Sequence, residues 1–179
     1  MNKLAITCLL ASGLILSACG TNEAFAEEKT PNVTVNIINS KGADIGTAQL
    51  SQIGDKVQIL IEAHNLPPGI HGTHFHAVGR CDTPDFKTAE AHLNPKHKQH
   101  GFENPKGFHA GDLPNIEVGA DGKVRANITT TTVTLEKGKP NSLLRPGGTS
   151  LIIHDKADDY ITDPTGNSGD RIACGAIKE

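Results

Sequence analysis

Aromatic residues are scarce in this sequence, and its basic residues form no extended stripe. The 179 residues include no tryptophan, one tyrosine and five phenylalanines, and the formal net charge is −3. The core must therefore be built from valine, isoleucine and leucine with a few phenylalanines. Nucleic-acid-binding proteins usually carry a basic patch, and those that hold single strands add aromatic side chains for base stacking. Since the chain has neither feature, nucleic-acid binding has no support.

The chain also has no apolar run long enough for a good membrane-spanning helix, which needs about 20 residues. Residues 4–15 form an apolar stretch behind Lys3, and small residues follow up to Cys19. This order is typical of a secretion signal. The segment 16–20, LSACG, resembles the lipobox of bacterial lipoproteins, which implies cleavage before Cys19 and attachment of lipid to its thiol. A cleaved signal without lipid is the alternative.

Three parts are therefore expected along the chain: a lipoprotein signal peptide at residues 1–18, a flexible tether at 19–31 and one domain at 32–179. The tether is polar and shows no apolar periodicity. A lipid on Cys19 would fasten the domain to the extracytoplasmic side of a bacterial cell membrane.

Residues 32–179 are expected to form an all-β domain. Short runs of β-branched and apolar residues alternate with turns rich in Gly, Pro and Asn, a pattern typical of sandwiches and barrels. The expected strands are 33–39, 43–50, 56–64, 71–78, 123–133, 150–154 and 171–176. No internal repeat or second-domain boundary appears. We expect these strands to pack as a Greek-key β-sandwich or flattened barrel.

Several histidines occur at spacings that suit metal binding. His74 and His76 are two apart in an alternating pattern, so both project from the same face of a strand. The irregular stretch 92–113 carries four further candidates, and a long structured loop of this kind usually has a metal to hold it in shape. His154 ends an apolar run and could complete the first site. The candidate ligands are His74, His76, His92, His100, His109, Asp112 and His154.

This set predicts two metal ions rather than one. An all-imidazole set suits copper, whereas three imidazoles and one carboxylate suit tetrahedral zinc. Spacing alone does not say which metal binds where. The other three histidines are expected to be ordinary residues, because His64 ends a strand, His71 sits in a turn and His97 lies in a lysine-rich solvated stretch.

Taken together, these motifs resemble the copper/zinc superoxide dismutases over residues 33–177. The resemblance is carried by GTHFH at 72–76, HLNP at 92–95, HG at 100–101, FHAGDL at 108–113, IHDKADD at 153–159 and GNSGDRIACG at 166–175. They occur in the family's order. The resemblance supports the flattened-barrel fold, an immunoglobulin-like sandwich with long metal-binding and electrostatic loops.

The resemblance implies one copper ion and one zinc ion per subunit, with His92 bridging the two. The copper ligands would be His74, His76, His92 and His154, and the zinc ligands His92, His100, His109 and Asp112. The implied activity is dismutation of superoxide to dioxygen and hydrogen peroxide by a redox-cycling copper beside a structural zinc.

Two further charged residues receive roles from the resemblance. Asp158 would accept hydrogen bonds from His74 and His100 and so fix both rings. Arg171 would guide and anchor the substrate anion beside copper, and with His92 it would take part in catalysis. The alternatives are an ordinary solvated aspartate and a surface arginine. The segment 160–165 is shorter than in better-known eukaryotic members and lacks their charged steering residues.

Cysteine usage agrees with an oxidising compartment. Cys8 would be lost with the signal and Cys19 would carry lipid, which leaves Cys81 and Cys174. The resemblance implies that these two form the family's intrasubunit disulfide. Two reduced, buried thiols are the alternative.

The expected function is therefore an enzyme that protects the cell surface from extracellular superoxide. The alternative is a non-catalytic copper- and zinc-binding surface protein. Metal stores and chaperones tend to use exchangeable Met, Cys or His clusters, but Met1 is the only methionine and the candidate ligands are spread over three segments. The choice between a monomer and a homodimer stays open.

Overall fold

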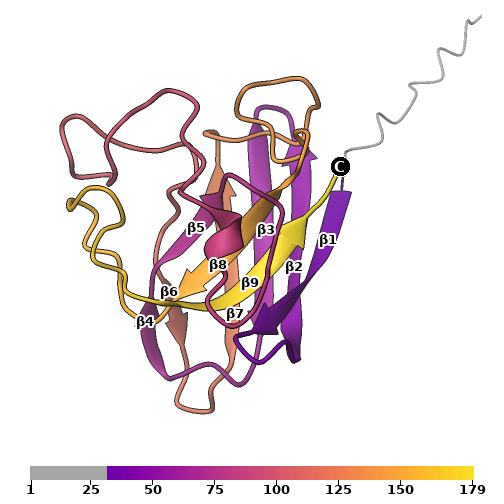
Figure 1. The fold of residues 1–179 in the computed structure, drawn as a ribbon, viewed down its shortest axis with the longest axis vertical. Helices are drawn as coiled ribbons and strands as arrows, with labels where there is room; N and C mark the ends of the chain where they lie inside the picture. The colour runs from indigo at the N-terminus through magenta and orange to yellow at the C-terminus, as the bar shows by residue number, and fades with distance from the viewer. Residues whose placement is uncertain (1–31) are drawn as a thin grey trace, which may run out of the picture.

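A computed structural model describes residues 32–179, so the expected signal, the tether and Cys19 lie outside the described residues. This part of the chain contains nine strands and one short 3-10 helix, and Figure 1 shows how they are arranged. They are β1 (Asn32–Asn39), β2 (Asp44–Ile53), β3 (Lys56–Ala63), β4 (Gly69–His71), β5 (Thr73–His76), η1 (Lys87–Ala89), β6 (Ile116–Val118), β7 (Val124–Thr130), β8 (Thr149–His154) and β9 (Arg171–Ile177). Within residues 32–179, no helix has the length and apolar character needed to cross a membrane.

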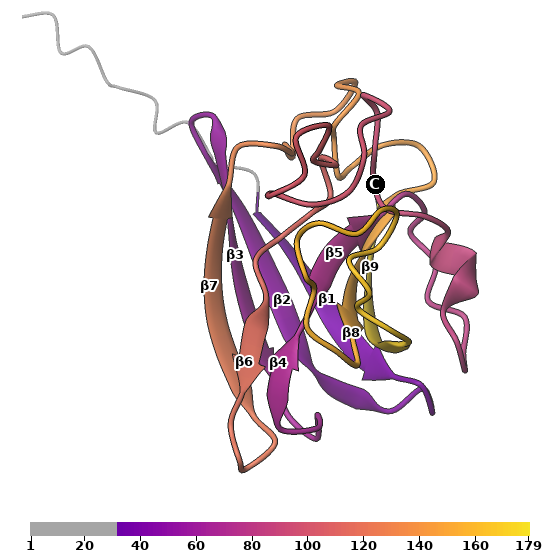
Figure 2. The same ribbon diagram turned by 90° about the vertical axis from the view of Figure 1, so that its left-hand side faces the viewer.

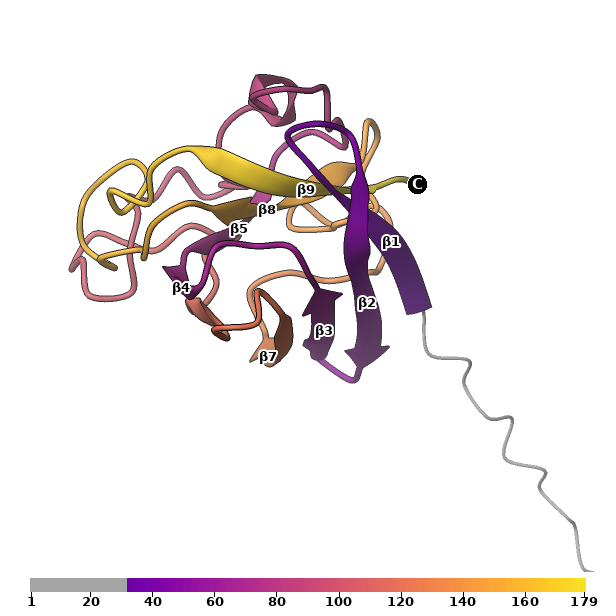
Figure 3. The same ribbon diagram turned by 90° about the horizontal axis from the view of Figure 1, so that it is seen from below.

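The strands form a flattened barrel. Seven of them make one antiparallel sheet in the order β5-β8-β9-β1-β2-β3-β7, and β4 pairs with β6 in a small second sheet. The large sheet curls around the core, as Figures 2 and 3 show from two directions. Only Gly72 separates β4 from β5, and a turn at 119–123 joins β6 to β7, so the small sheet links the two ends of the large one. The all-β, flattened-barrel prediction is confirmed.

Two expectations about the strands were wrong. The single strand predicted at 71–78 is two strands, because the backbone of Gly72 bonds to the last residue of β8 and to Lys156 just after it instead of continuing the β4 ladder. Its N–H donates to the carbonyl of Lys156 at 2.8 Å, and its carbonyl accepts the N–H of His154 at 2.9 Å. The strand β6 was not predicted, since three residues are too few to show an alternating pattern.

The core is aliphatic, as the shortage of aromatic residues requires. In β3, the side chains of Val57, Ile59 and Ile61 are fully buried, and they alternate with the more exposed Gln58, Leu60 and Glu62 on the outer face. Phe75 is the one phenylalanine in the main core cluster. It lies on β5 between two candidate ligands, so the packing of the core holds the strand that carries them.

The disulfide between Cys81 and Cys174 is confirmed, with the two Cα atoms 5.7 Å apart. Cys174 lies on β9 and faces Ile152 of β8, and both are fully buried in a small cluster with Phe86. The bond therefore ties the segment that leads to His92 to the centre of the large sheet.

We expect reduction of this disulfide to destabilise the metal-free protein. The closed loop spans 93 residues, and loop-closure entropy sets an upper value of about 4.7 kcal/mol, with about 2–4 kcal/mol typical of measured disulfides. Urea unfolding with and without reductant measures the difference on the same chain. A Cys81→Ser variant should unfold like the reduced protein in both buffers. Equal midpoints for oxidised and reduced wild type would contradict the prediction.

Candidate metal centre

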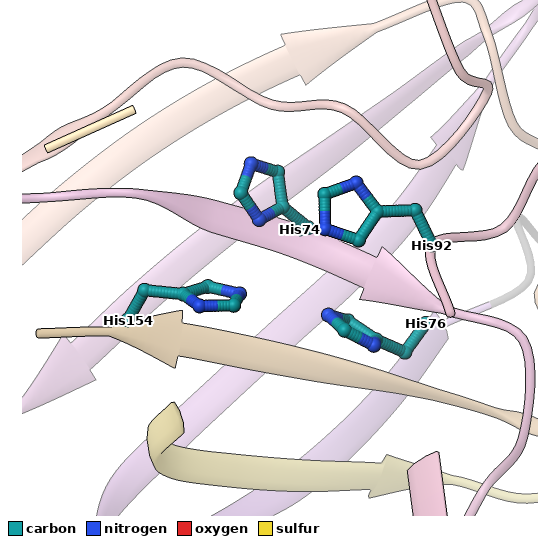
Figure 4. Close-up of side chains that lie close together, drawn as sticks. All are labelled: His74, His76, His92 and His154. Atoms are coloured by element: carbon teal, nitrogen blue, oxygen red, sulfur yellow. The ribbon is translucent and has the colours of Figure 1, made fainter. Parts of the chain in front are cut away.

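Four histidines from three separate segments meet beside the barrel wall, and we call them the four-histidine group. His74 and His76 lie on β5, and His154 ends the neighbouring strand β8. His92 comes from the long segment after β5 and meets that strand through an isolated bridge with His76. Figure 4 shows the four rings turned toward a common centre. All four residues are buried.

One nitrogen of each ring in the four-histidine group is buried without a hydrogen-bond partner. These atoms are His74 Nδ1, His76 Nε2, His92 Nε2 and His154 Nε2. Each ring offers a ligand atom within 4.8 Å of those offered by the other three. A buried polar atom without a partner costs about 1–3 kcal/mol. A metal ion at the common centre would satisfy all four, so this group fits a metal.

The opposite nitrogens are fixed by oxygen acceptors, which orient the rings. His76 Nδ1 lies 2.7 Å from the carbonyl oxygen of Glu90, and His154 Nδ1 lies 3.3 Å from that of Gly169. His74 Nε2 lies 2.7 Å from a carboxylate oxygen of Asp158. An N–H directed outward leaves the lone pair of the other nitrogen directed inward, as metal-ligating histidines require.

Burial keeps these rings uncharged in the metal-free protein. Loss of solvent, with a smaller repulsion from His74, lowers the pKa of His92 to about 3 and that of His154 to about 2. Loss of solvent likewise lowers the pKa of His74 and of His76. Neutral imidazoles have a free lone pair, so a cation can bind at neutral pH without displacing protons.

A second cluster, which we call the mixed group, combines three histidines with one carboxylate. Asp112 Oδ1 lies 3.1 Å from His92 Nδ1, 3.0 Å from His100 Nδ1 and 3.3 Å from His109 Nδ1. His109 Nδ1 is also 3.3 Å from His92 Nδ1. Three imidazole nitrogens and one carboxylate oxygen at these separations suit a tetrahedral ion.

The carboxylate of Asp112 is held in place by the loop around it. Its Oδ2 accepts the backbone N–H groups of Gly101 and His109, each at 3.0 Å, which leaves Oδ1 directed at the three rings. Burial alone would raise the pKa of Asp112, but hydrogen bonds, above all from His100, hold it far below its usual range. Asp112 is therefore ionised and can ligate a cation.

Backbone hydrogen bonds to β5 explain why the segments that carry His92 and Asp112 lie close to this strand. The carbonyl of Gly111 accepts the N–H of Phe75 at 2.8 Å, and the carbonyl of Phe75 accepts the N–H of Leu93 at 2.8 Å. A Cβ on Gly111 would lie 2.2 Å from the carbonyl oxygen of Phe75. Only glycine permits this approach, which brings the segments of His92 and Asp112 against the strand of His74.

Both groups include His92. Its Nε2 belongs to the four-histidine group and its Nδ1 to the mixed group. The ring thus stands between the two groups and offers one nitrogen to each.

Besides His92, Asp158 also links the two groups, through the ring nitrogens of His74 and His100 that do not face the other ligands of their groups. Its Oδ2 lies 2.7 Å from His74 Nε2, and its Oδ1 lies 3.0 Å from His100 Nε2. Asn115 fixes the backbone of Asp158 from both sides, accepting its N–H at 2.8 Å and donating to its carbonyl at 2.9 Å. Burial lowers the pKa of His100, but its contacts with Asp112 and Asp158 outweigh this and raise the pKa to about 9.

His74 also offers a nitrogen within 4.8 Å of part of the mixed group. We nevertheless assign it to the four-histidine group. Its Nε2 contacts Asp158, while its unpartnered Nδ1 faces the other three rings. His109 completes the mixed group because its Nδ1 is within 3.3 Å of Asp112 Oδ1 and of His92 Nδ1.

Arg171 stands beside the four-histidine group at the start of β9. Its guanidinium is half-buried and donates to the carbonyls of Phe86 and Glu90, each at 2.7 Å. The carbonyl of Glu90 also accepts from His76, so one oxygen positions both side chains. The positive charge of Arg171 helps to lower the pKa of His76. The Arg171 side chain and His92 both line an open depression.

Sequence reasoning missed one residue of the centre, His71. It was expected in a turn, but it ends β4 and is buried. Its Nδ1 lies 2.7 Å from the carbonyl oxygen of His154, and its Nε2 lies 2.8 Å from that of Pro67. The ring therefore braces the end of β8. No alternating pattern in the sequence marks this residue, because residues 71–76 are all buried and the ring's main partner, His154, is distant in the chain.

Comparisons with known proteins agree with this geometry. A sequence model of the family described as "Copper/zinc superoxide dismutase (SODC)" matches residues 45–177. The chain is 48% identical over 161 residues to "Superoxide dismutase [Cu-Zn] 1" of Aquifex aeolicus, which covers 89% of this chain and 95% of that protein.

Two solved structures are also similar. A crystal structure of a double mutant of a SOD-like protein from Bacillus subtilis has a TM-score of 0.79 and 46% identity, covering 82% of this chain and 97% of that one. The Cu/Zn superoxide dismutase from Brucella abortus has a TM-score of 0.66 and 28% identity, covering 82% and 99%.

We expect a Gly166→Ala substitution to weaken metal binding at the mixed group. A Cβ on Gly166 would lie 1.9 Å from Asp158 Oδ1 and 2.6 Å from His100 Nε2, so the contact between these side chains must break. Loss of a partner behind a metal ligand typically lowers affinity by about 10–100-fold. Competition with a zinc chelator measures the change.

Gly138→Ala is the matched control for this test. Gly138 has a similar positive φ of 77°, against 63° for Gly166, but no atom lies within 4 Å of its Cβ position. Both variants carry the backbone strain of a left-handed alanine, and only Gly166→Ala disturbs the centre. Equal zinc affinity in the two variants would show that the contact of Asp158 with His100 is not needed.

Proposed function

The chain belongs to the copper/zinc superoxide dismutase family, and we propose that it dismutates superoxide on the outer side of a bacterial cell membrane. The observation that carries the activity is the set of four buried, unpartnered ring nitrogens that face one centre. A second metal position shares His92 with it. The two ions used by the family are copper and zinc, and both groups fit them.

We assign copper to the four-histidine group and zinc to the mixed group. Four imidazoles without a carboxylate suit copper, which favours nitrogen ligands in a tetragonal arrangement. Three imidazoles and the ionised Asp112 suit tetrahedral zinc. In this assignment one copper and one zinc would bind per subunit, and His92 would supply one ligand nitrogen to each.

The copper ion supplies the one-electron chemistry, in which one superoxide is oxidised to dioxygen and a second, with two protons, is reduced to hydrogen peroxide. His92 handles the proton in this scheme. Its Nε2 lies at the four-histidine group, where the substrate reacts, while its Nδ1 stays among the ligands of the mixed group. A ring held in this way can carry a proton on Nε2 and deliver it to the reduced substrate.

Arg171 anchors the substrate anion in this scheme. The guanidinium carries a permanent charge and several N–H groups in one plane. Two of its N–H groups are used by backbone carbonyls, which fix its orientation. It lines the same depression as His92, so an anion there can contact both side chains.

The activity is tested on the purified protein after reconstitution with copper and zinc. We expect copper-dependent superoxide dismutation with about one copper and one zinc per chain. His92→Ala should disturb the binding of both metals, because the ring serves both groups. Arg171→Ala should keep both metals but turn over more slowly, since only the anion contact is lost. Stopped-flow superoxide decay and elemental analysis of the same samples give the two readouts.

Two results would count against this assignment. An Arg171→Ala protein with undiminished rate would remove the anion role from that residue. Uptake of zinc without copper and without turnover would instead support a non-catalytic copper- and zinc-binding surface protein.

The location is the second part of the proposal. The Cys81–Cys174 disulfide supports an oxidising compartment, since such bonds rarely persist in the cytosol. The segment 16–20 has the sequence expected where a lipoprotein signal is cleaved before Cys19. Residues 19–31 then act as a tether between the lipid and β1. A homodimer stays a prediction, which sedimentation of the purified protein tests.

We expect Cys19→Ala to move the protein from the membrane fraction to the soluble fraction. Loss of the thiol removes the point of lipid attachment, and residues 32–179 contain no spanning helix to replace it. Fractionation of cells, followed by radiolabelled palmitate incorporation, measures this. Cys8→Ala is the control, because it changes a cysteine inside the signal and should leave the lipid in place. A Cys19→Ala protein that still labels with palmitate would disprove the anchor.

A further inference from the structure

The one tyrosine of the chain, Tyr160, lies two residues after Asp158 and has an unusual backbone conformation. Its φ is 61°, in the left-handed region that is costly for residues with a Cβ. Such a conformation persists only where the surrounding structure holds it, and it is found most often at functional sites. The contacts that hold Tyr160 therefore indicate what the residue does.

The phenol hydroxyl of Tyr160 joins it to the start of β6. The hydroxyl accepts the backbone N–H of Asn115 at 2.7 Å, and Asn115 directly precedes β6. The side chain of Asn115 in turn accepts the N–H of Asp158 at 2.8 Å and donates to its carbonyl at 2.9 Å. The backbone N–H of Tyr160 closes the circle of contacts, because it donates to Asp158 Oδ1 at 2.7 Å. Asp158 is thus held by two residues that also hold each other.

The carboxylate oxygen that Tyr160 contacts is the one that faces the mixed group. Asp158 Oδ1 lies 3.0 Å from His100 Nε2, whereas Oδ2 lies 2.7 Å from His74 Nε2. A rotation of this carboxylate would lengthen one contact or both. The N–H of Tyr160 opposes that rotation, since it donates to Oδ1 from a backbone that the phenol ties to β6.

Tyr160 also fastens the segment 160–163 to the segment 100–104, which begins with a histidine of the mixed group. The carbonyl of Tyr160 accepts the N–H of Glu103 at 2.9 Å. The centre of its ring lies 5.6 Å from that of Phe102. The loops that carry the two segments lie side by side in Figures 1 and 3. The residue therefore holds both the carboxylate behind the histidine and the loop that carries the histidine.

We propose that Tyr160 is a positioning residue for the mixed group. Its hydroxyl fixes Asn115 and so keeps Asp158 in place, and Asp158 orients the ring of His100. The Nδ1 of that ring then faces the other ligands before an ion binds, so little ordering is left to be done on binding. This inference rests on the proposed function, because it takes zinc to be the ion of the mixed group.

The test removes the hydroxyl and keeps the ring, in the variant Tyr160→Phe. The N–H of Asn115 then loses its acceptor, so Asp158 is held less firmly. We expect zinc affinity, measured by competition with a chelator, to fall by about tenfold, as is typical when a partner behind a ligand is lost. Zinc-loaded, copper-free protein is used, so the result does not depend on turnover.

Proton exchange at single rings tells positioning from general loosening. In zinc-loaded protein labelled with ¹⁵N-histidine, NMR follows the N–H that His100 directs at Asp158. This proton should exchange with water several-fold faster in Tyr160→Phe. The N–H that His76 directs at the carbonyl of Glu90, at 2.7 Å, is the internal reference and should keep its wild-type rate.

Thr134→Val is the matched control, because it also removes a hydroxyl that accepts a backbone N–H. This hydroxyl accepts from Glu136 at 3.1 Å and donates to the side chain of Gln52 at 3.0 Å, in the segment between β7 and β8. Neither partner belongs to a metal-binding group. Zinc affinity and exchange at His100 should match wild type, and a loss equal to that in Tyr160→Phe would overturn the proposal.

The remaining outcomes separate this inference from the proposed function. If the wild type binds zinc and turns over while Tyr160→Phe keeps its zinc affinity, the function stands and the hydroxyl has no positioning role. A lower affinity with unchanged exchange at His100, or with equally faster exchange at His76, also overturns the inference. If the wild type itself binds no zinc, the metal assignment fails and this inference fails with it.

Discussion

An imidazole ring has two nitrogens, and in His92 each of them belongs to a different one of the two candidate metal-binding groups. Because one ring serves both groups, it has to lie where the two groups meet and in a single orientation. This requirement fixes much of the surrounding structure. The isolated bridge between His92 and His76 sets its distance from β5. Asp112 and His109 hold its Nδ1 side. A shift of the ring toward either group would lengthen its contacts with the other.

The barrel supplies a rigid wall against which this ring is placed. The register of β5 and β8 sets His74 opposite Ile152, and His154 follows after a register shift in the ladder between β8 and β9. Phe75 anchors β5 in the core between the two histidines of that strand. Asp158 then fixes His74 and His100 from behind. The ligands that come from loops are therefore positioned by strands and by carboxylates, and not by loop stiffness alone.

Much of this arrangement could be predicted because its signals are local. A spacing of two residues on a strand puts His74 and His76 on one face whatever the rest of the fold does. The paths of the loops are different, because they depend on contacts between distant segments. The hydrogen bond between His71 and the carbonyl of His154 joins residues 83 positions apart, and no local sequence pattern predicts it. The split at Gly72 has the same cause, since it follows from bonds to β8 and not from the strand's own sequence.

The unpartnered nitrogens also bear on the choice between a catalyst and a metal store. Each such atom costs about 1–3 kcal/mol while it lacks a partner, and whole domains are stable by only about 5–15 kcal/mol. Four of them in one place therefore make bound metal part of what stabilises the fold. A store must release its metal readily and remain folded. The buried rings, the disulfide and the contacts of Asp158 all oppose the opening that release requires. A centre of this kind suits a resident metal that reacts with a small anion at an open depression, which is what dismutation of superoxide requires.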